Sequence, residues 1–291
     1  MGSFFSEGDG TDRGYVNVRD AADGICADGR AYTELLWRRF SDFADSQFLR
    51  EAKDNFTERF WEMYLGCTLI DCGYEIGTPG DEGPDLFTHV IDKFFWFEAT
   101  ASSAGTKDDQ VPKPTVGEAG FVPEDKILLR LTNAIDAKLR QIERAQERGI
   151  VSERDGALVC INGRQIPNTT VDAVPPLIVQ AVLAIGNPQI TLDRYTMQVI
   201  SSGFEKRPHL KKASGTEIST RGFVDGSLAR ISAVIYSHVD CVNHPPRLGD
   251  DFLCVHNPYA IHPLPIGFLG RGVEYWVQED NKLMSKDFSV K

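Results

Sequence analysis

The stretch that decides the fold runs from residue 83 to residue 101 and reads GPDLFTHVIDKFFWFEATA. It contains two extended segments, Asp85 to Ile91 and Phe94 to Ala101, joined by the polar pair Asp92-Lys93. Runs of aromatic and β-branched residues bounded by turn residues are typical of β-strands. Because the second segment is almost wholly apolar, we expect it to be a central strand that is covered on both faces.

Two acidic residues lie at the same end of this predicted hairpin. Asp85 begins the first strand, and Glu98 lies near the end of the second. Side chains alternate along a strand, so Glu98 shares a face with Thr100 and sits within an aromatic segment. A buried charge is costly unless it is paired or bound to a metal. Neighbouring antiparallel strands bring paired Cβ atoms within about 5 Å, so two carboxylates there favour a shared divalent cation, Mg²⁺ or Mn²⁺.

The segment before the hairpin is predicted to be helical over residues 31–72. Apolar residues recur there at four-residue spacing, which is typical of one buried helix face. Glu58 and Glu62 are four residues apart and therefore lie on one side of the helix. Glu58 fits an exposed acid. Glu62 is surrounded by apolar neighbours, which leaves a structural salt bridge and a role in the site equally open.

After the hairpin we expect a loop over residues 102–123, a helix from Pro123 to about Arg148 and a strand from Ala157 to Asn162. The second half of the chain is predicted to form strands near 176–186, 194–201, 229–238, 251–256 and 272–277. This order predicts the α/β class, with a mixed central β-sheet flanked by helices. We divide the chain into a polar, mobile N-terminal arm (1–23), a core (24–163) and a β-rich C-terminal extension (164–291) packed on the same domain.

The order of these motifs resembles the PD-(D/E)XK nuclease superfamily, whose fold is restriction-endonuclease-like. The resemblance rests on helix-borne Glu62, on Gly83-Pro84-Asp85, and on the apolar strand that ends in Glu98-x-Thr100, followed by a helix and a strand. It covers about residues 50 to 163. It implies divalent-metal-dependent hydrolysis of phosphodiester bonds, with Asp85 and Glu98 as metal ligands and Glu62 joining them directly or through water.

The sequence departs from that superfamily at Thr100, where a lysine is usual. A lysine there would orient and deprotonate water and offset the charge of the attacked phosphate. Threonine carries no charge, so the cation must come from elsewhere or the site is inactive. Arg130 and Lys138 follow one face of the predicted helix at i and i+8, so either side chain could reach the site, although Lys138 also fits an ordinary solvated charge.

Charge and composition narrow the choice of partners. The 31 Lys and Arg residues are outnumbered by 42 Asp and Glu residues, giving a net charge of −11, which argues against a protein coated in nucleic acid. A local excess of positive charge lies within residues 205–221, where it fits either a solvated loop or a phosphate-contacting patch. The candidate nucleic-acid-binding residues are Lys206, Arg207, Lys211, Lys212 and Arg221.

The remaining signals concern compartment and cysteine chemistry. No apolar run approaches the roughly 20 residues that span a bilayer, and the N-terminus lacks a secretory pattern, so we expect a cytoplasmic protein with no membrane association. The six cysteines are expected to be mostly buried free thiols. A weaker alternative is a zinc site formed within a group of histidines and cysteines. That group comprises His238, Cys241, His244, Cys254, His256 and His262.

The sequence therefore predicts a metal-dependent nuclease that uses Mg²⁺ or Mn²⁺ and acts on nucleic acid, with DNA the favoured substrate. The catalytic candidates are Glu62, Asp85, Glu98, Thr100, Arg130 and Lys138. The alternative is a catalytically inactive protein of the same fold that binds nucleic acid or a protein partner. A homodimer or a defence-system partner protein would fit either hypothesis, on analogy of fold alone.

Overall fold

The computed structural model describes residues 2–79, 83–169, 173–279 and 281–289. At its centre is an eight-stranded mixed sheet in the order β1-β2-β3-β4-β9-β10-β11-β12. These strands are β1 (Ile76–Gly77), β2 (Leu86–Val90), β3 (Lys93–Ser103), β4 (Gly156–Gln165), β9 (Ala233–Ser237), β10 (Leu253–His256), β11 (Val273–Val277) and β12 (Leu283–Asp287). The predicted α/β class with a mixed central sheet is confirmed.

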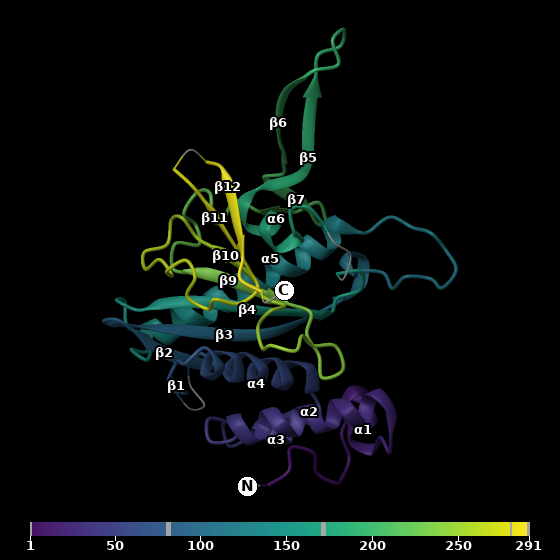
Figure 1. Ribbon diagram of the computed structural model, residues 1–291, viewed down its shortest axis with the longest axis vertical. Helices are drawn as coiled ribbons and strands as arrows, with labels where there is room; N and C mark the ends of the chain where they lie inside the picture. The colour runs from purple at the N-terminus through teal and green to yellow at the C-terminus, as the bar shows by residue number, and fades with distance from the viewer. Residues whose placement is uncertain (1, 80–82, 170–172, 280, 290–291) are drawn as a thin grey trace.

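Helices cover both faces of this sheet (Figure 1). One face is covered by α4 (Phe56–Asp71), with α1 (Arg13–Asp20), α2 (Gly24–Phe40) and α3 (Phe48–Ala52) forming a further layer outside it. The other face is covered by α5 (Glu124–Glu147) and α6 (Leu177–Leu183). The short 3₁₀ helix η1 (Lys107–Asp109) interrupts the predicted loop between β3 and α5. Among the described residues, no helix combines the length and the hydrophobicity that a bilayer crossing requires.

Two small pairs of strands lie outside the main sheet. The pair β5 (Ile185–Leu192) and β6 (Val199–Lys206) forms a two-stranded ribbon that projects far from the body of the molecule (Figure 1). The pair β7 (His209–Lys211) and β8 (Glu217–Ser219) follows it along the chain. The strand predicted near 194–201 is wrong over residues 194–198, which connect the two strands at the tip of this ribbon, and only its last residues, from Val199, belong to β6.

The alternation predicted for the central strand is present in β3. Phe95 and Phe97 are buried in the core on the α4 side, whereas Trp96 packs with Ala145 of α5 and with Val151. Both faces of the strand are therefore covered, which explains why it contains so few polar residues.

The predicted helix over 31–72 is divided into α2, α3 and α4. The four-residue apolar spacing continues through the break, because Phe48 and Ala52 of α3 and Phe56 of α4 are all buried in one core. The Asp12 carboxylate accepts the backbone N–H of Phe56 at 3.0 Å and also caps the start of α1. A side chain outside the segment thus fixes where α4 begins, a signal that spacing alone does not carry.

The N-terminal segment differs from the mobile arm that we expected over 1–23. It contains helix α1, and Phe4 and Tyr15 are fully buried against α2 and α4. The Glu34 carboxylate holds the chain in place by accepting the backbone N–H groups of Phe4 and Phe5. The aromatic residues of an otherwise polar stretch therefore complete the outer helical layer.

The strand that we predicted near 176–186 is wrong over residues 177–183, which form α6. Every residue of α6 is buried. A fully buried apolar run has no polar face to reveal its period, so a helix and a central strand share one sequence pattern. The helix begins after Pro175-Pro176, and the Gln180 amide donates to the carbonyl of Pro175 at 2.9 Å.

Strand directions bring several chain segments to one edge of the sheet. β2 and β3 are antiparallel with Leu86 opposite Phe97, so the start of β2 lies beside the end of β3. β3, β4 and β9 are mutually parallel neighbours, with Glu98 beside Val159 and Val159 beside Val234. The carboxyl ends of three parallel strands and the residue before β2 therefore meet at this edge, where open α/β sheets commonly bind ligands.

Candidate active site

Asp85 and Glu98 lie next to each other across β2 and β3, as the sequence predicted, although β3 continues to Ser103 and Glu98 lies at its middle. Asp85 directly precedes β2, and the register places it opposite Glu98 on β3. The Asp85 Oδ2 atom accepts the backbone N–H of Ala99 at 2.6 Å, which fixes its carboxylate against the middle of β3. Glu98 is buried, and its side chain lies on the face of the sheet that α5 covers, where it contacts Lys138.

The cation at this site is Lys138 of α5. Its Nζ atom donates to Oε1 of Glu98 at 2.7 Å, and only 15% of the Lys138 side chain is exposed. The side chain is therefore no solvated helix charge. The helix runs alongside β3, so that Arg130, two turns earlier on α5, reaches the carbonyl of Ser103 at 2.9 Å instead. Of the two predicted cations, the structure brings Lys138 to the acids and places Arg130 farther along the strand.

The acids are held in an environment that disfavours their charged forms. Burial, followed by the charge of Asp85, raises the pKa of Glu98 from 4.5 to about 7, against the opposing effect of Lys138. Burial also raises the pKa of Asp85, although Lys138 and the Ala99 N–H favour its ionised form. Burial alone would lower the pKa of Lys138, but Glu98 and Asp85 outweigh it and the pKa is raised. Lys138 therefore remains protonated. Its single positive charge does not fully offset the negative charges of Asp85 and Glu98.

Glu58 is a member of this group that the sequence reasoning missed. It lies in the first turn of α4, and its Oε1 atom is 3.5 Å from the Thr100 hydroxyl. Its charge acts on Asp85, Glu98 and Lys138 alike, raising the pKa of each. The signal was the i, i+4 pair of acids on α4, but the sequence did not show which of the two faces the end of β3.

Glu62 is held by Arg59 instead. An Arg59 nitrogen lies 2.5 Å from Oε2 of Glu62, and the same guanidinium pairs with Glu51 and with Asp45. Burial, followed by the charge of Asp85, raises the pKa of Glu62 well above its usual value despite Arg59. The charge of Asp85 therefore acts on Glu62, but the contact that Glu62 makes is a salt bridge with Arg59. Of the two alternatives that the sequence left open, this is the structural one.

The donor set suits a hard divalent cation. Asp85, Glu98 and Glu58 surround a single ammonium, so the cluster carries an excess of negative charge that a divalent ion would neutralise. Mg²⁺ typically takes one or two protein carboxylates and keeps several of its waters. Within the described part of the chain, no three His, Cys, Asp or Glu side chains converge closely enough to form a complete ligand set by themselves.

Several residues of the predicted basic cluster lie beside acidic side chains. Arg207 is tied to Glu124 of α5 and to Gln180 of α6, and Arg221 lies 3.8 Å from Asp225. Lys206 and Lys211 are exposed on β6 and β7, and Lys212 follows β7. Lys211 lies opposite Glu217 across β7 and β8, and the charge of Lys212 acts on Asp136. Four of the five candidates thus have acidic neighbours, which reduce the positive charge available to a phosphate.

The histidines and cysteines that suggested zinc are also dispersed. His256 pairs with Glu274 at 2.8 Å, and its Nε2 is 3.9 Å from the Cys254 sulfur, inside the core. His244 stacks on Tyr32, and His262 contacts the carbonyl of Glu153. His238 contacts the ring of Tyr236 edge-on, and Cys241 is buried. All six cysteines are free thiols, as expected.

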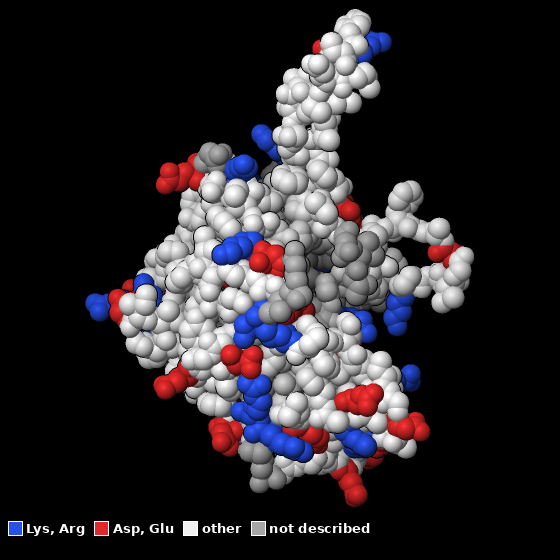
Figure 2. Space-filling view, viewed as in Figure 1, with Lys and Arg blue, Asp and Glu red and all other residues white. Residues whose placement is uncertain are grey.

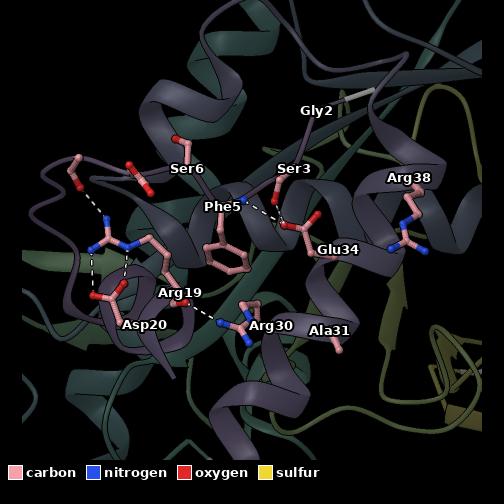
Figure 3. A pocket seen from close by; sticks show the side chains of 12 residues that line it. Gly2, Ser3, Phe5, Ser6, Arg19, Asp20, Arg30, Ala31, Glu34 and Arg38 are labelled. Carbon is pink, nitrogen blue, oxygen red and sulfur yellow. Dashed lines mark hydrogen bonds and ion pairs between the residues drawn. The ribbon is translucent and has the colours of Figure 1, made fainter. Parts of the chain in front are cut away.

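A pocket of about 1000 Å³ lies elsewhere, between the N-terminal segment and helices α1 and α2 (Figure 3). Its polar side chains are largely occupied by one another. Arg19 pairs with Asp20, Arg30 donates to the carbonyl of Arg19, and Glu34 holds the N-terminal chain. The pocket belongs to the packing of the N-terminal segment and is remote from Asp85 and Glu98.

Comparison of the chain with protein-family models, with curated proteins and with solved structures finds no match in any of the three.

Proposed function

We propose that this protein is a divalent-metal-dependent nuclease whose active site consists of Asp85, Glu98 and Lys138, with Glu58 in support. The observation that carries the proposal is the 2.7 Å contact between Lys138 and Glu98 beside Asp85. It supplies, from the following helix, the positive charge that Thr100 lacks. The order of α4, the β1–β3 meander, α5 and β4 parallel to β3 supports the same interpretation.

In this proposal each residue has a distinct role. A divalent cation, when bound, would polarise the scissile phosphate and lower the pKa of a coordinated water. Asp85 and Glu98 hold the cation through carboxylate oxygens, and the Ala99 N–H keeps Asp85 in position. Lys138 orients the attacking water and offsets negative charge on the phosphate. Thr100 and Glu58 border the site from β3 and from the start of α4.

The test is cleavage of supercoiled plasmid, linear duplex DNA, single-stranded DNA and RNA in the presence of Mg²⁺ or Mn²⁺. We expect cleavage of at least one substrate, DNA being favoured, that stops with EDTA and with Asp85→Ala. Asp92→Ala is the matched control, because Asp92 lies in the exposed turn at the opposite end of the same hairpin. Cleavage that persists in EDTA and in Asp85→Ala, or no cleavage of any substrate, would overturn the proposal.

A further inference from the structure

A second pocket, of about 620 Å³, lies among strands β9 to β12 on the face of the sheet that α6 covers. Side chains of the sheet form much of its lining. Tyr236 and Leu253 are cross-strand partners on β9 and β10, and Tyr275 and Ser285 are partners on β11 and β12. Leu177 of α6 lines it as well. Its volume lies within the range of about 300–1000 Å³ that is typical of small-molecule sites.

The lining of this pocket is aromatic and polar without being charged. Among the described residues that line it, none is Asp, Glu, Lys or Arg. His238 and Tyr275 are half-buried, so part of each ring remains open to a ligand. Tyr236 holds the His238 ring edge-on, with the ring centroids 4.9 Å apart. Aromatic faces beside an imidazole and the hydroxyls of Tyr275 and Ser285 suit an uncharged heteroaromatic ring, which can both stack and form hydrogen bonds.

The pocket lies on the same face of the sheet as the acid cluster. Thr100, which borders the cluster, pairs with Ile161, and Ile161 pairs with Tyr236. Neighbouring strands are about 4.8 Å apart, so Tyr236 is about 10 Å from Thr100 across the sheet. That separation is roughly the rise of three stacked nucleotides, at about 3.4 Å each. A strand whose scissile phosphate lies at Asp85 and Glu98 therefore has a base within reach of the pocket.

The charge of the protein gives a second reason to expect contacts with bases. The net charge is −11. On the face of the molecule that Figure 2 shows, Lys and Arg side chains are interspersed with Asp and Glu side chains. Attraction for phosphates alone is weak on such a surface. Stacking of bases on aromatic side chains contributes to the binding of single strands without requiring a basic surface, and the pocket supplies the rings for it.

We infer that this pocket holds an unpaired base of the substrate strand, about two or three nucleotides from the scissile phosphate and stacked against Tyr275 and His238. The inference rests on the proposed nuclease function, because the distance is taken from Asp85 and Glu98. A base that remains paired stays within the duplex stack and does not enter such a pocket. The substrate is therefore single-stranded, or locally opened, at this position.

The first test measures the binding of short, fluorescently labelled single strands of DNA and of RNA by anisotropy in EDTA, where the proposed cleavage does not occur. We expect Tyr275→Leu to raise the Kd of the preferred strand about tenfold or more. Tyr259→Leu is the matched control and should change it less than twofold, because Tyr259 is 55% exposed in the turn beyond the opposite end of β10. Equal Kd values for the two variants, or no binding of either strand, would overturn the inference.

The second test uses the wild-type chain, so it does not depend on how Tyr275→Leu folds. A single strand that carries one 5-iodouracil, moved along its length in a series, is irradiated with the protein in EDTA, and the crosslinked peptides are sequenced. We expect crosslinks to His238, Tyr275 or Met284, all of which line the pocket. Crosslinks that fall only outside the pocket would contradict the inference.

The two proposals fail in different ways. Metal-dependent cleavage of duplex DNA, without crosslinks in the pocket, would overturn the base pocket and leave the nuclease function standing. Crosslinks in the pocket, without cleavage of any substrate in Mg²⁺ or Mn²⁺, would support the base pocket and overturn the nuclease function. Cleavage that favours single strands, together with crosslinks in the pocket, is the result expected from both.

Discussion

The ammonium of Lys138 lies 2.7 Å from the carboxylate of Glu98, although 40 residues separate them in the chain. The two side chains meet because α5 packs along β3 with its buried face toward the sheet. Since Glu98 and Asp85 are adjacent across β2 and β3, one lysine serves two acids. This arrangement gives definite expectations for variants of the cluster.

Replacing Lys138 should abolish most of the proposed activity while leaving the neighbouring helix intact. We expect Lys138→Met to lower kcat by about 10²–10³, the effect of losing a group that stabilises transition-state charge. Arg130→Met is the matched control, because it removes a cation from the same helix that contacts the Ser103 carbonyl instead. Single-turnover cleavage rates would measure the difference. Equal losses in the two variants would argue against a catalytic role for Lys138.

The two acids of α4 should behave differently when each is replaced by its amide. We expect Glu58→Gln to reduce cleavage, since Glu58 faces Thr100 and acts on all three members of the cluster. Glu62→Gln should leave cleavage largely unchanged, because Glu62 contacts Arg59, and it should not lower the free energy of unfolding at neutral pH, because the raised pKa of Glu62 shows that the folded state disfavours its charged form. Cleavage rates and urea unfolding of both variants would separate the effects. The reverse pattern would show that Glu62 is the helix acid of the site.

Stability without metal should fall as the pH rises from about 4.5 to about 7. The folded state keeps a proton on Glu98 up to its raised pKa of about 7, whereas the unfolded chain releases it near the ordinary value. The folded state thus binds more protons in this window, and the free energy of unfolding decreases with pH. For Glu98 alone this amounts to about 3 kcal/mol at most.

This pH dependence can be measured by urea unfolding in buffers that contain EDTA. Glu98→Gln should flatten the slope between pH 4.5 and 7, although Asp85 and Glu62, whose pKa values are also raised, will retain part of it. Glu153→Gln, at an exposed position, is the control and should leave the slope unchanged. Parallel slopes for the wild type and Glu98→Gln would show that Glu98 ionises in the folded state much as it does in the unfolded chain.

The N-terminal segment should contribute substantially to stability. Phe4 is fully buried among Phe48, Phe56 and Trp37, so Phe4→Ala should cost about 3–5 kcal/mol. Ile25→Ala, at a position that is 64% exposed, should change stability by no more than about 0.5 kcal/mol. Thermal and chemical unfolding would measure both. A Phe4→Ala variant as stable as the wild type would instead support the mobile N-terminal arm that the sequence suggested.

The sequence predicted the hairpin and the adjacent acids because both depend on local rules. Alternation along β3 assigns Glu98 to one face, and the short turn sets Asp85 opposite it. The sequence could also identify Lys138 as a candidate, because helical spacing places Lys138 and Arg130 on one face of α5. The rotation of α4 about its axis, which decides between Glu58 and Glu62, depends on tertiary packing and had no local signal.

The remaining errors also arise from long-range packing. Residues 177–183 are buried on all sides, so their period was hidden. Phe4 is buried largely through contacts with residues 30 or more positions away, such as Glu34 and Trp37. The β5–β6 ribbon pairs locally, but its projection from the body depends on how the rest of the chain folds.

The most direct test of the central claim is a calorimetric titration of the protein with Mn²⁺ above pH 7. Because the acids outnumber the cations around Glu98, we predict saturable binding by the wild-type protein that is strongly reduced in Asp85→Asn and in Glu98→Gln, and retained in Asp92→Ala. No saturable binding by the wild type would contradict the claim that these two acids share a divalent cation. Binding by Asp85→Asn and Glu98→Gln that is as strong as binding by the wild type would contradict it too.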